Sequence, residues 1–246
     1  MDARESIIVA LDTKAVPKAL ELVTLLRDHV GGFKVGLEFF TSTYALLMAL
    51  PPNVIGNVLR ELQELYAALS GSLFWDGKWN DIPNTCLNTA LGLQPLKAKY
   101  LNIHASSGKN AIQDTVANKG GAKVLAVTVL TSLDAEEVKL IFGDEPNVVV
   151  LRLARIAKSA GADGVICSPK ELELLSGDSE LATLIKVTPG VRPLWAAAGD
   201  QKRIMTPKEA KDAGASAMVI GRPITSPPKE IGTPLDAVKR ILDEIA

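Results

Sequence analysis

The sequence has few of the residues that carry most metal and disulfide chemistry. Among 246 residues there are only two histidines, His29 and His104, and two cysteines, Cys86 and Cys167. The cysteines lie far apart without metal-binding or redox spacing, which is typical of the reducing cytoplasm and argues against a disulfide scaffold. A multi-histidine metal site is not favoured, and a Ser-His-Asp triad could use only His104. Chemistry is therefore expected to depend on Lys, Asp or Glu.

The sequence also lacks a large excess of either charge and any long apolar run. Its 27 basic and 28 acidic residues give a formal net charge of −1, so no broad basic surface for nucleic acid is expected. The longest apolar candidate, residues 44–59, is interrupted by Pro51 and Pro52 and is not expected to span a membrane. Residues 1–12 do not resemble a signal peptide. We expect a cytoplasmic protein without membrane or nucleic-acid partners.

Short apolar, β-branched runs recur along the chain and alternate with amphipathic helical patterns. The runs predict strands at residues 6–12, 32–37, 72–78, 100–106, 123–130, 164–168, 185–191 and 217–223. Nearly continuous apolar runs are expected for parallel strands that are buried on both faces. Eight alternations of strand and helix in a chain of this length are typical of an α/β protein with a (β/α)8 TIM-barrel fold.

The alternative fold is a doubly wound open sheet. Such a sheet normally has a glycine-rich turn after its first strand, whereas residues 10–20 read ALDTKAVPKAL and contain no glycine. No linker, repeat or low-complexity segment interrupts the alternation. The sequence therefore predicts one barrel domain over residues 1–246, with a longer helical connection at about residues 41–70.

Charged residues gather at the C-terminal ends of the first three predicted strands, where the chemistry of a barrel takes place. Asp12 ends the first strand, Lys34 lies in the second, and Asp76 and Lys78 point to one face of the third. Asp81 follows in the loop and joins them only if the loop folds back. Ion pairs on loops are usually solvated and contribute little to the stability of the fold. Charges on the inward face of a barrel are costly unless paired, so the cluster favours a functional role.

The loops after the seventh and eighth predicted strands form a second candidate site. In TIM barrels these two loops commonly bind phosphate. Gln201 and Arg222 supply hydrogen-bond donors, and Gly199 and Gly221 allow close approach to the backbone. The alternative is an ordinary loop with surface Arg and Lys. We favour the phosphate site.

The segment DGKWNDIPNT, residues 76–85, resembles the signature of the orotidine 5′-phosphate decarboxylase family, Asp-x-Lys-x-x-Asp-Ile-Pro-Asn-Thr. Other segments resemble the strand-end motifs of that family in the same order: VALD, FKVGLEFF, NIHAS, AVTVLTS, GADGVICSP, VTPGVRP, GDQKRIMTP and VIGRPIT. Sugar-phosphate decarboxylases and synthases share Asp-x-Lys-x-x-Asp, but DIPNT together with GDQKR and IGRPIT is more specific. The sequence departs from the family pattern in two places. Trp79 and Asn80 occupy positions at which Phe and His are frequent in the family, and residues 40–71 match the family poorly.

The resemblance implies decarboxylation of orotidine 5′-monophosphate to UMP, without a cofactor or metal, in a homodimer with shared active sites. It implies an alternating charge network of Lys34, Asp76, Lys78 and Asp81, the last contributed across the dimer interface. Lys78 would stabilise the carbanion at C6 and donate its proton. The implied substrate-binding residues are Asp12 at the ribose, Ile82 and Thr85 from the partner, Thr131 and Ser132 by the pyrimidine or ribose, and Arg192, Gln201, Gly221 and Arg222 at the phosphate.

Two alternative functions remain open at this point. One is a metal-dependent sugar-phosphate decarboxylase or synthase on a similar barrel, against which the DIPNT run argues. The other is a non-catalytic barrel that binds only nucleotide phosphate. The chain has all four charged residues of the network, which argues against a barrel that has lost catalytic activity.

Overall fold

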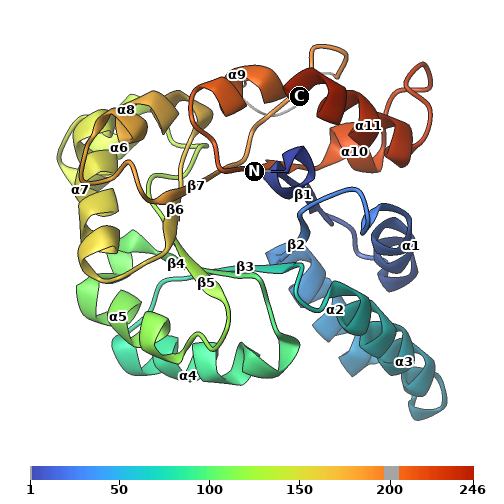
Figure 1. Cartoon of the computed structure of the whole chain (residues 1–246). Helices are drawn as coiled ribbons and strands as arrows, with labels where there is room; N and C mark the ends of the chain where they lie inside the picture. Colours follow the sequence, from blue (N-terminus) through green and yellow to red (C-terminus); the bar gives the residue numbers. More distant parts are fainter. Residues whose placement is uncertain (1, 197–204) are drawn as a thin grey trace.

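Eight parallel strands close into a barrel, and helices surround it (Figure 1). The computed structural model describes residues 2–196 and 205–246. The strands are β1 (Ile7–Ala10), β2 (Gly32–Gly36), β3 (Leu73–Trp79), β4 (Tyr100–His104), β5 (Lys123–Val127), β6 (Gly164–Ile166), β7 (Ile185–Thr188) and β8 (Ala217–Ile220). Each strand pairs with the next one along the chain, and β8 pairs with β1. The predicted TIM-barrel fold is confirmed, and the open doubly wound sheet is excluded.

Most of the predicted strands are too long at their C-terminal ends. The first was expected to reach Asp12 but ends at Ala10, and the fifth was expected to reach Leu130 but ends at Val127. The apolar runs continue because Leu11 and Val129 remain buried beyond the last paired residue, with 1 % and 2 % exposure. Burial in the turns that leave the barrel therefore extends the apolar pattern past the hydrogen-bonded strand.

The helices lie outside the barrel, between the strands and the solvent (Figure 1). They are α1 (Val16–Leu26), α2 (Leu37–Ala49), α3 (Pro52–Leu69), α4 (Pro83–Leu93), α5 (Lys109–Asn118), α6 (Ala135–Phe142), α7 (Pro146–Ser159), α8 (Leu172–Gly177), α9 (Pro207–Asp212), α10 (Arg222–Thr225) and α11 (Pro234–Ile245), with short 3-10 turns η1 (Ala3–Ser6), η2 (Gln94–Leu96), η3 (Ala105–Ser107) and η4 (Pro169–Glu171). Thr206 caps α9, since its side chain accepts a hydrogen bond from the backbone N–H of Glu209. None of the described helices has the length and apolar character needed to cross a membrane.

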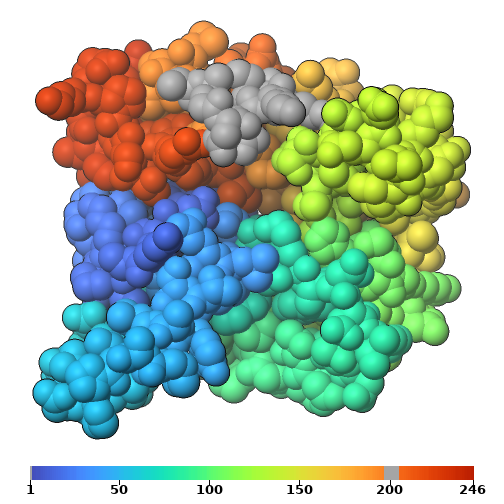
Figure 2. Space-filling view, turned by 180° about the vertical axis from the view of Figure 1, so that it is seen from behind, coloured from blue at the N-terminus to red at the C-terminus, as the bar shows by residue number. Residues whose placement is uncertain are grey.

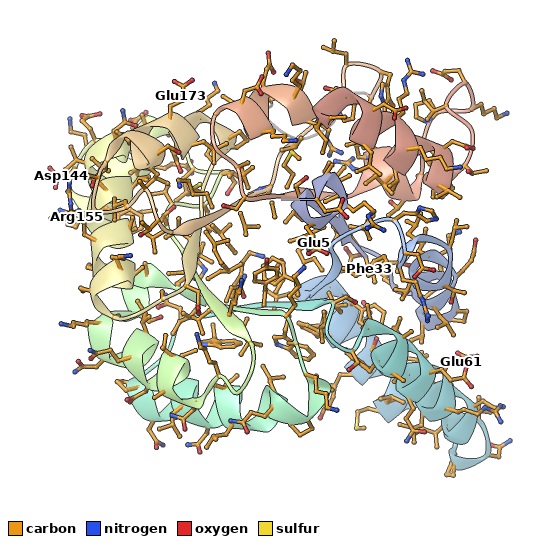
Figure 3. The ribbon with its side chains drawn as sticks, in the orientation of Figure 1. Glu5, Phe33, Glu61, Asp144, Arg155 and Glu173 are labelled. Atoms are coloured by element: carbon orange, nitrogen blue, oxygen red, sulfur yellow. The ribbon has the colours of Figure 1, made fainter. Side chains whose placement is uncertain are left out.

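The core has two layers because alternate residues of each strand point to opposite faces of the sheet. Inside the barrel a cluster forms from Ile8, Ala10, Phe74, Tyr100, Leu125, Val127, Ile166, Val187, Ala217 and Val219. The larger cluster lies between the strands and the helices, and Phe33 of β2, labelled in Figure 3, belongs to it. Charged side chains such as Asp144, Arg155 and Glu173 lie on the outer rim (Figure 3). These apolar side chains fill the interior of the barrel, so the polar groups lie at its mouth.

The connection from β2 to β3 folds as two helices, α2 and α3, which project from the barrel as a lobe (Figures 1 and 2). Aromatic rings attach this lobe to β3. Phe40 of α2 stacks on Trp75 with ring centroids 3.8 Å apart, and Tyr66 of α3 lies 6.4 Å from the same indole. Trp75 directly precedes Asp76 in the chain, so the lobe packs against the strand that carries the candidate acid.

Candidate active site

The polar ends of β1, β2 and β3 meet at one mouth of the barrel. In the pairing of β1 with β2, Ala10 lies beside Lys34, and in the pairing of β2 with β3, Gly36 lies beside Asp76. Asp12 follows the end of β1 by two residues. These registers place the carboxylates of Asp12 and Asp76 on either side of the Lys34 ammonium group.

An unbroken series of ion pairs links four charged side chains. Lys34 Nζ lies 3.1 Å from Asp12 Oδ1 and 3.1 Å from Asp76 Oδ2. Lys78 Nζ lies 2.6 Å from the same oxygen of Asp76. The signs alternate, so each charge is next to an opposite one and the four side chains together carry no net charge. The structure thus brings together Lys34, Asp76 and Lys78, as the strand order predicted.

Burial distinguishes the members of this series. The side chain of Asp76 is 5 % exposed and that of Lys34 is 13 % exposed, whereas that of Asp12 is 56 % exposed. Burial alone would raise the pKa of the Asp76 carboxyl, but the charges of Lys34 and Lys78 outweigh it and hold that pKa below its usual value. Burial acts to lower the pKa of Lys34, but the charges of Asp76 and Asp12 hold it above its usual value. Both groups are therefore charged at neutral pH.

Lys78 has an uncommon backbone conformation near the end of β3. Its φ is 46°, in the left-handed region that residues with a side chain rarely adopt. The pairing of β3 with β4 shifts register between Trp75 and Trp79, at the same place. A Cβ atom added to Gly77 would lie 3.0 Å from Trp75 Nε1 and 3.1 Å from Trp79, so the two indoles flank that position. This irregular strand end places Lys78 Nζ against Asp76.

Asn102 of β4 completes the cluster and was missed by the sequence analysis. Its side chain is fully buried, and its Nδ2 donates a hydrogen bond to Asp76 Oδ1 at 2.5 Å. Its Oδ1 accepts a hydrogen bond from the backbone N–H of Lys78 at 2.7 Å. A signal was available in the sequence, because an amide within an otherwise apolar strand must find hydrogen-bond partners when it is buried.

His104 lies at the end of β4, two residues after Asn102, and is half-buried. Burial lowers the pKa of its imidazole, and the positive charge of Lys78 lowers it further against the opposing effect of Asp76. His104 is therefore neutral at neutral pH. Among the described residues, no three His, Cys, Asp or Glu side chains are grouped so that they could hold a metal ion.

The loop after β3 does not fold back onto the cluster. Asp81 is exposed, and its Oδ1 accepts a hydrogen bond from the backbone N–H of the next residue, Ile82, at 2.7 Å. The hydroxyl of Ser107 donates to Asn80 Oδ1 at 2.8 Å and ties this loop to η3. Ile82 is 65 % exposed, and Thr85 is also exposed at the start of α4. Within one chain, the condition on which Asp81 was expected to join the cluster is not met.

The second candidate site is a cavity of about 360 Å³ next to the first. Residues of β1 and β2 line one side, and Arg192, Gly221 and Arg222 line the other. Burial lowers the pKa of the Arg192 guanidinium, and the charge of Arg222 lowers it further. The buried Arg192 Nε has no hydrogen-bond partner among the described residues. Two guanidinium groups facing one cavity form a site for a multiply charged anion.

Two predicted binding residues do not line the cavity, and a third lies outside the described residues. Thr131 is half-buried and Ser132 is exposed in the turn between β5 and α6, and neither lines this cavity. Gln201 lies outside the described residues, as does Gly199. The expectations for Thr131 and Ser132 rest on the resemblance, whereas those for Gln201 and Gly199 come from their place in the loop after the seventh predicted strand, with the resemblance adding support for Gln201.

The sequence was compared with protein families and with curated proteins. The model of the family described as "Orotidine 5′-phosphate decarboxylase / HUMPS family" matches residues 5–233. The orotidine 5′-phosphate decarboxylase of Moorella thermoacetica is 40 % identical over 256 residues, covering 100 % of this chain and 94 % of that protein. The enzyme of the same name from Geobacter sulfurreducens is 41 % identical over 251 residues, covering 99 % and 97 %.

A comparison with solved structures agrees with the sequence matches. The crystal structure of orotidine 5′-phosphate decarboxylase from Lactobacillus acidophilus superimposes with a TM-score of 0.72 at 32 % identity. The match covers 97 % of this chain and 98 % of that one. The likeness therefore extends over the barrel as a whole and is not confined to the DGKWNDIPNT segment.

The buried charge of Asp76 predicts a pH-dependent contribution to stability. Because the charges of Lys34 and Lys78 hold the pKa of Asp76 below its usual value in the folded protein, the contribution is complete above the pKa of the unfolded state. It is lost as the pH falls through the pKa of the folded state. We expect Asp76→Asn to lower the free energy of unfolding by about 3 kcal/mol at pH 7, since it leaves two lysines without their shared carboxylate. The difference from wild type should shrink below about pH 4.

Urea unfolding followed by circular dichroism between pH 3 and pH 8 measures this difference. The matched control is Asp212→Asn. The Asp212 side chain is 62 % exposed and forms a surface ion pair with Lys208. The control should change the free energy of unfolding by less than about 1 kcal/mol. An Asp76→Asn protein as stable as wild type at pH 7 would contradict the prediction, as would a difference that stays constant down to pH 3.

Proposed function

Since the chain belongs to the orotidine 5′-phosphate decarboxylase / HUMPS family, we propose that Lys78 is the group that stabilises the reacting carbon and protonates it. The protein catalyses the decarboxylation of orotidine 5′-monophosphate to UMP, a step of pyrimidine biosynthesis. The observation that carries the proposal is the position of the Lys78 ammonium, 2.6 Å from the buried Asp76 carboxylate at the mouth of the barrel. Lys34 contacts the same carboxylate oxygen at 3.1 Å.

The reaction requires a fixed positive charge. Loss of CO₂ breaks the bond between C6 and its carboxyl carbon and leaves the electron pair on C6. This pair lies in the plane of the pyrimidine ring and cannot spread into the ring π system. A preorganised cation beside C6 stabilises that charge without reorganising during the reaction. The Lys78 ammonium then transfers a proton from Nζ to C6, and the neutral amine regains a proton from solvent after the product leaves.

The size of the electrostatic effect limits what Lys78 contributes. Two unit charges about 4 Å apart interact by roughly 4 kcal/mol at an effective dielectric constant near 20. That energy corresponds to about three powers of ten in rate. Typical enzymatic accelerations are larger, so orientation of the substrate and binding energy from its other groups must supply the remainder.

In this proposal Asp76 and Lys34 hold the Lys78 ammonium group in place, directed at C6. The Lys78 ammonium group contacts Asp76 Oδ2, and the Lys34 ammonium group contacts the same oxygen and helps to neutralise its charge. Asp12 contacts Lys34 and has its carboxylate 56 % exposed, so it remains available to accept hydrogen bonds from ribose hydroxyls. The same series of charges thus orients the catalytic ammonium at one end and the sugar at the other.

The cavity beside the charge series suits the phosphate of the nucleotide. It extends from Asp12 and Lys34 to Arg192 and Arg222, so ribose at the first pair puts the phosphate at the second. A phosphate dianion between the guanidinium groups would relieve their mutual repulsion and satisfy the buried Arg192 Nε. Binding energy from this remote group helps to orient the pyrimidine at Lys78. Gly221 and, by resemblance, Gln201 belong to the same end, and Thr131 and Ser132 are assigned to the pyrimidine or ribose.

We also propose a homodimer in which the loop after β3 serves the partner's active site. Asp81, Ile82 and Thr85 are exposed and do not reach Lys78 of their own chain. Because Asp81 is exposed and Ile82 is 65 % exposed, both side chains are accessible to a partner chain. In the dimer, Asp81 would supply the second negative charge next to Lys78 of the partner, completing the alternating network.

The first prediction concerns Lys78→Ala, assayed by the loss of orotidine 5′-monophosphate absorbance in the presence of a chelator. We expect turnover to fall by at least about 10³-fold, because the cation at C6 and its proton are removed together. UMP affinity should remain within about tenfold of wild type, since the phosphate and ribose contacts are unchanged.

The matched control is Lys119→Ala, which removes a lysine paired with Asp163 outside the site. Its turnover should stay close to that of wild type. If Lys78→Ala keeps more than a tenth of the activity, Lys78 does not have the proposed role. If the chelator abolishes wild-type turnover, the metal-dependent alternative is supported instead.

The second prediction concerns the shared site. Lys78→Ala and Asp81→Ala should each be nearly inactive alone, but a mixed dimer contains one site with both residues intact. The mixed dimer should therefore have about half of the wild-type activity, and random pairing of equal amounts, in which about half of the dimers are mixed, should restore about a quarter. Coexpression of the two variants with different affinity tags, followed by an activity assay of the doubly tagged dimer, measures this directly.

The control pairs Lys78→Ala with the double variant Lys78→Ala/Asp81→Ala, which leaves no intact site in any dimer. It should show no restored activity. Hybrid dimers of the two single variants that stay as inactive as their parents would show that Asp81 acts within its own chain or not at all.

A further inference from the structure

We infer that Asn102 is a positioning residue that sets the direction of the Lys78 side chain and the plane of the Asp76 carboxylate. The inference rests on the proposed function of Lys78 and extends it to a second strand, β4. Asn102 contacts neither the cavity that suits the phosphate nor the charged side chain of Lys34 in any described interaction. It acts through the two residues that it holds.

Asn102 is a fully buried amide with a defined orientation. Its Nδ2 lies 2.5 Å from Asp76 Oδ1, and its Oδ1 lies 2.7 Å from the backbone nitrogen of Lys78. An ionised carboxylate can only accept and a backbone N–H can only donate, so the two ends of the amide cannot be exchanged. One side chain thus forms hydrogen bonds with both the Asp76 carboxylate and the backbone N–H of Lys78.

The contact with Lys78 occurs where β3 departs from regular pairing. The pairing with β4 shifts register between Trp75 and Trp79, and Lys78 has a φ of 46°. A left-handed residue with a side chain persists only where its surroundings hold it. The Asn102 carbonyl oxygen takes the Lys78 N–H at this irregular position. Without it, the N–H would lose its partner, and the chain would relax toward a conformation that turns the ammonium away from C6.

The contact with Asp76 fixes the carboxylate as a whole. Both lysines bind Oδ2, at 2.6 Å and 3.1 Å, and only Asn102 is described on Oδ1. Three donors on two oxygens leave the carboxylate no free rotation about its terminal bond. Because the amide is uncharged, it does this without competing with the lysines for the negative charge.

The charged and titratable groups around Asn102 are few and come from three strands. Asp76 and Lys78 belong to β3, Lys34 belongs to β2, and His104 follows on β4 itself. Replacing the amide by a carboxylate of the same shape would set a second negative charge against Asp76 and remove the donor. The new carboxylate would also compete with Asp76 for the Lys78 ammonium group, so the position of that group would be less well defined.

The test uses Asn102→Asp, which keeps the shape, and Asn102→Ser, which keeps a smaller polar group without the added charge. We expect kcat to fall by about 100-fold in both. Asn102→Asp loses the donor to Asp76 and sets a second negative charge beside it, and the shorter side chain of Asn102→Ser cannot keep both hydrogen bonds. KM and the dissociation constant of UMP should change by less than about threefold, because the phosphate and ribose contacts remain. The expected result is therefore a low kcat together with nearly normal UMP binding in both variants.

A second readout separates positioning from general damage. A UMP analogue with an anionic oxygen on C6 places a negative charge where the carbanion forms and should bind wild type much more tightly than UMP. In both Asn102 variants this preference should shrink by about the same factor as kcat. The control is Thr115→Val in α5, which removes a buried hydrogen bond to Ala111 and should affect stability without changing kcat or the preference.

The outcomes distinguish the inference from the proposed function on which it rests. If Lys78→Ala does not abolish the preference for the C6 anion, the proposed role of Lys78 fails. If Lys78→Ala abolishes it but folded Asn102→Asp and Asn102→Ser keep both the preference and kcat, the inference about Asn102 is overturned while Lys78 keeps its role. An equal loss of UMP and analogue affinity in the Asn102 variants would also overturn it, because that is the result of a distorted site.

Discussion

The structure of the site depends on one buried carboxylate placed between two ammonium groups. Asp76 is 5 % exposed, and its Oδ2 lies 2.6 Å from Lys78 and 3.1 Å from Lys34. A buried charge is tolerated only when opposite charges and hydrogen bonds surround it, and here both lysines and Asn102 meet that requirement. The same arrangement holds the Lys78 ammonium group against Asp76. Neither lysine can be removed without leaving a buried charge poorly compensated.

The barrel supplies this arrangement through its strand order. Neighbouring strands deliver Lys34, Asp76 and Asn102 to the same mouth, while the apolar layer beneath them excludes other polar groups. The two arginines come from the loops after β7 and β8, across the cavity from the first two strands. A nucleotide fits this geometry because its phosphate and its reacting carbon are at opposite ends. Asp81 lies in the exposed loop after β3 and forms no described ion pair with Lys78 of its own chain, and the proposed dimer would place the Asp81 of a partner there.

The strands could be predicted from the sequence because parallel strands buried on both faces give long apolar runs, and the charged residues at their ends stood out against those runs. The strand ends were placed too late, since buried residues such as Leu11 continue the apolar pattern after pairing stops. Asn102 was missed because one amide in a strand looks like an ordinary half-buried residue until its partners are known. The left-handed turn at Lys78 leaves no trace in composition, and the position of Asp81 depends on a loop and a partner that no local pattern records.

The central claim is that Lys78 stabilises negative charge on C6, and exchange of the C6 hydrogen of UMP with solvent deuterium tests it most directly. This exchange passes through the same carbanion as the decarboxylation but needs no CO₂ to leave. Proton NMR of UMP in D₂O follows the C6 signal with wild type and with Lys78→Ala. The account predicts exchange catalysed by the wild type and none above the uncatalysed rate with the variant. Equal exchange by both proteins would contradict it, because the carbanion would then form without the Lys78 ammonium.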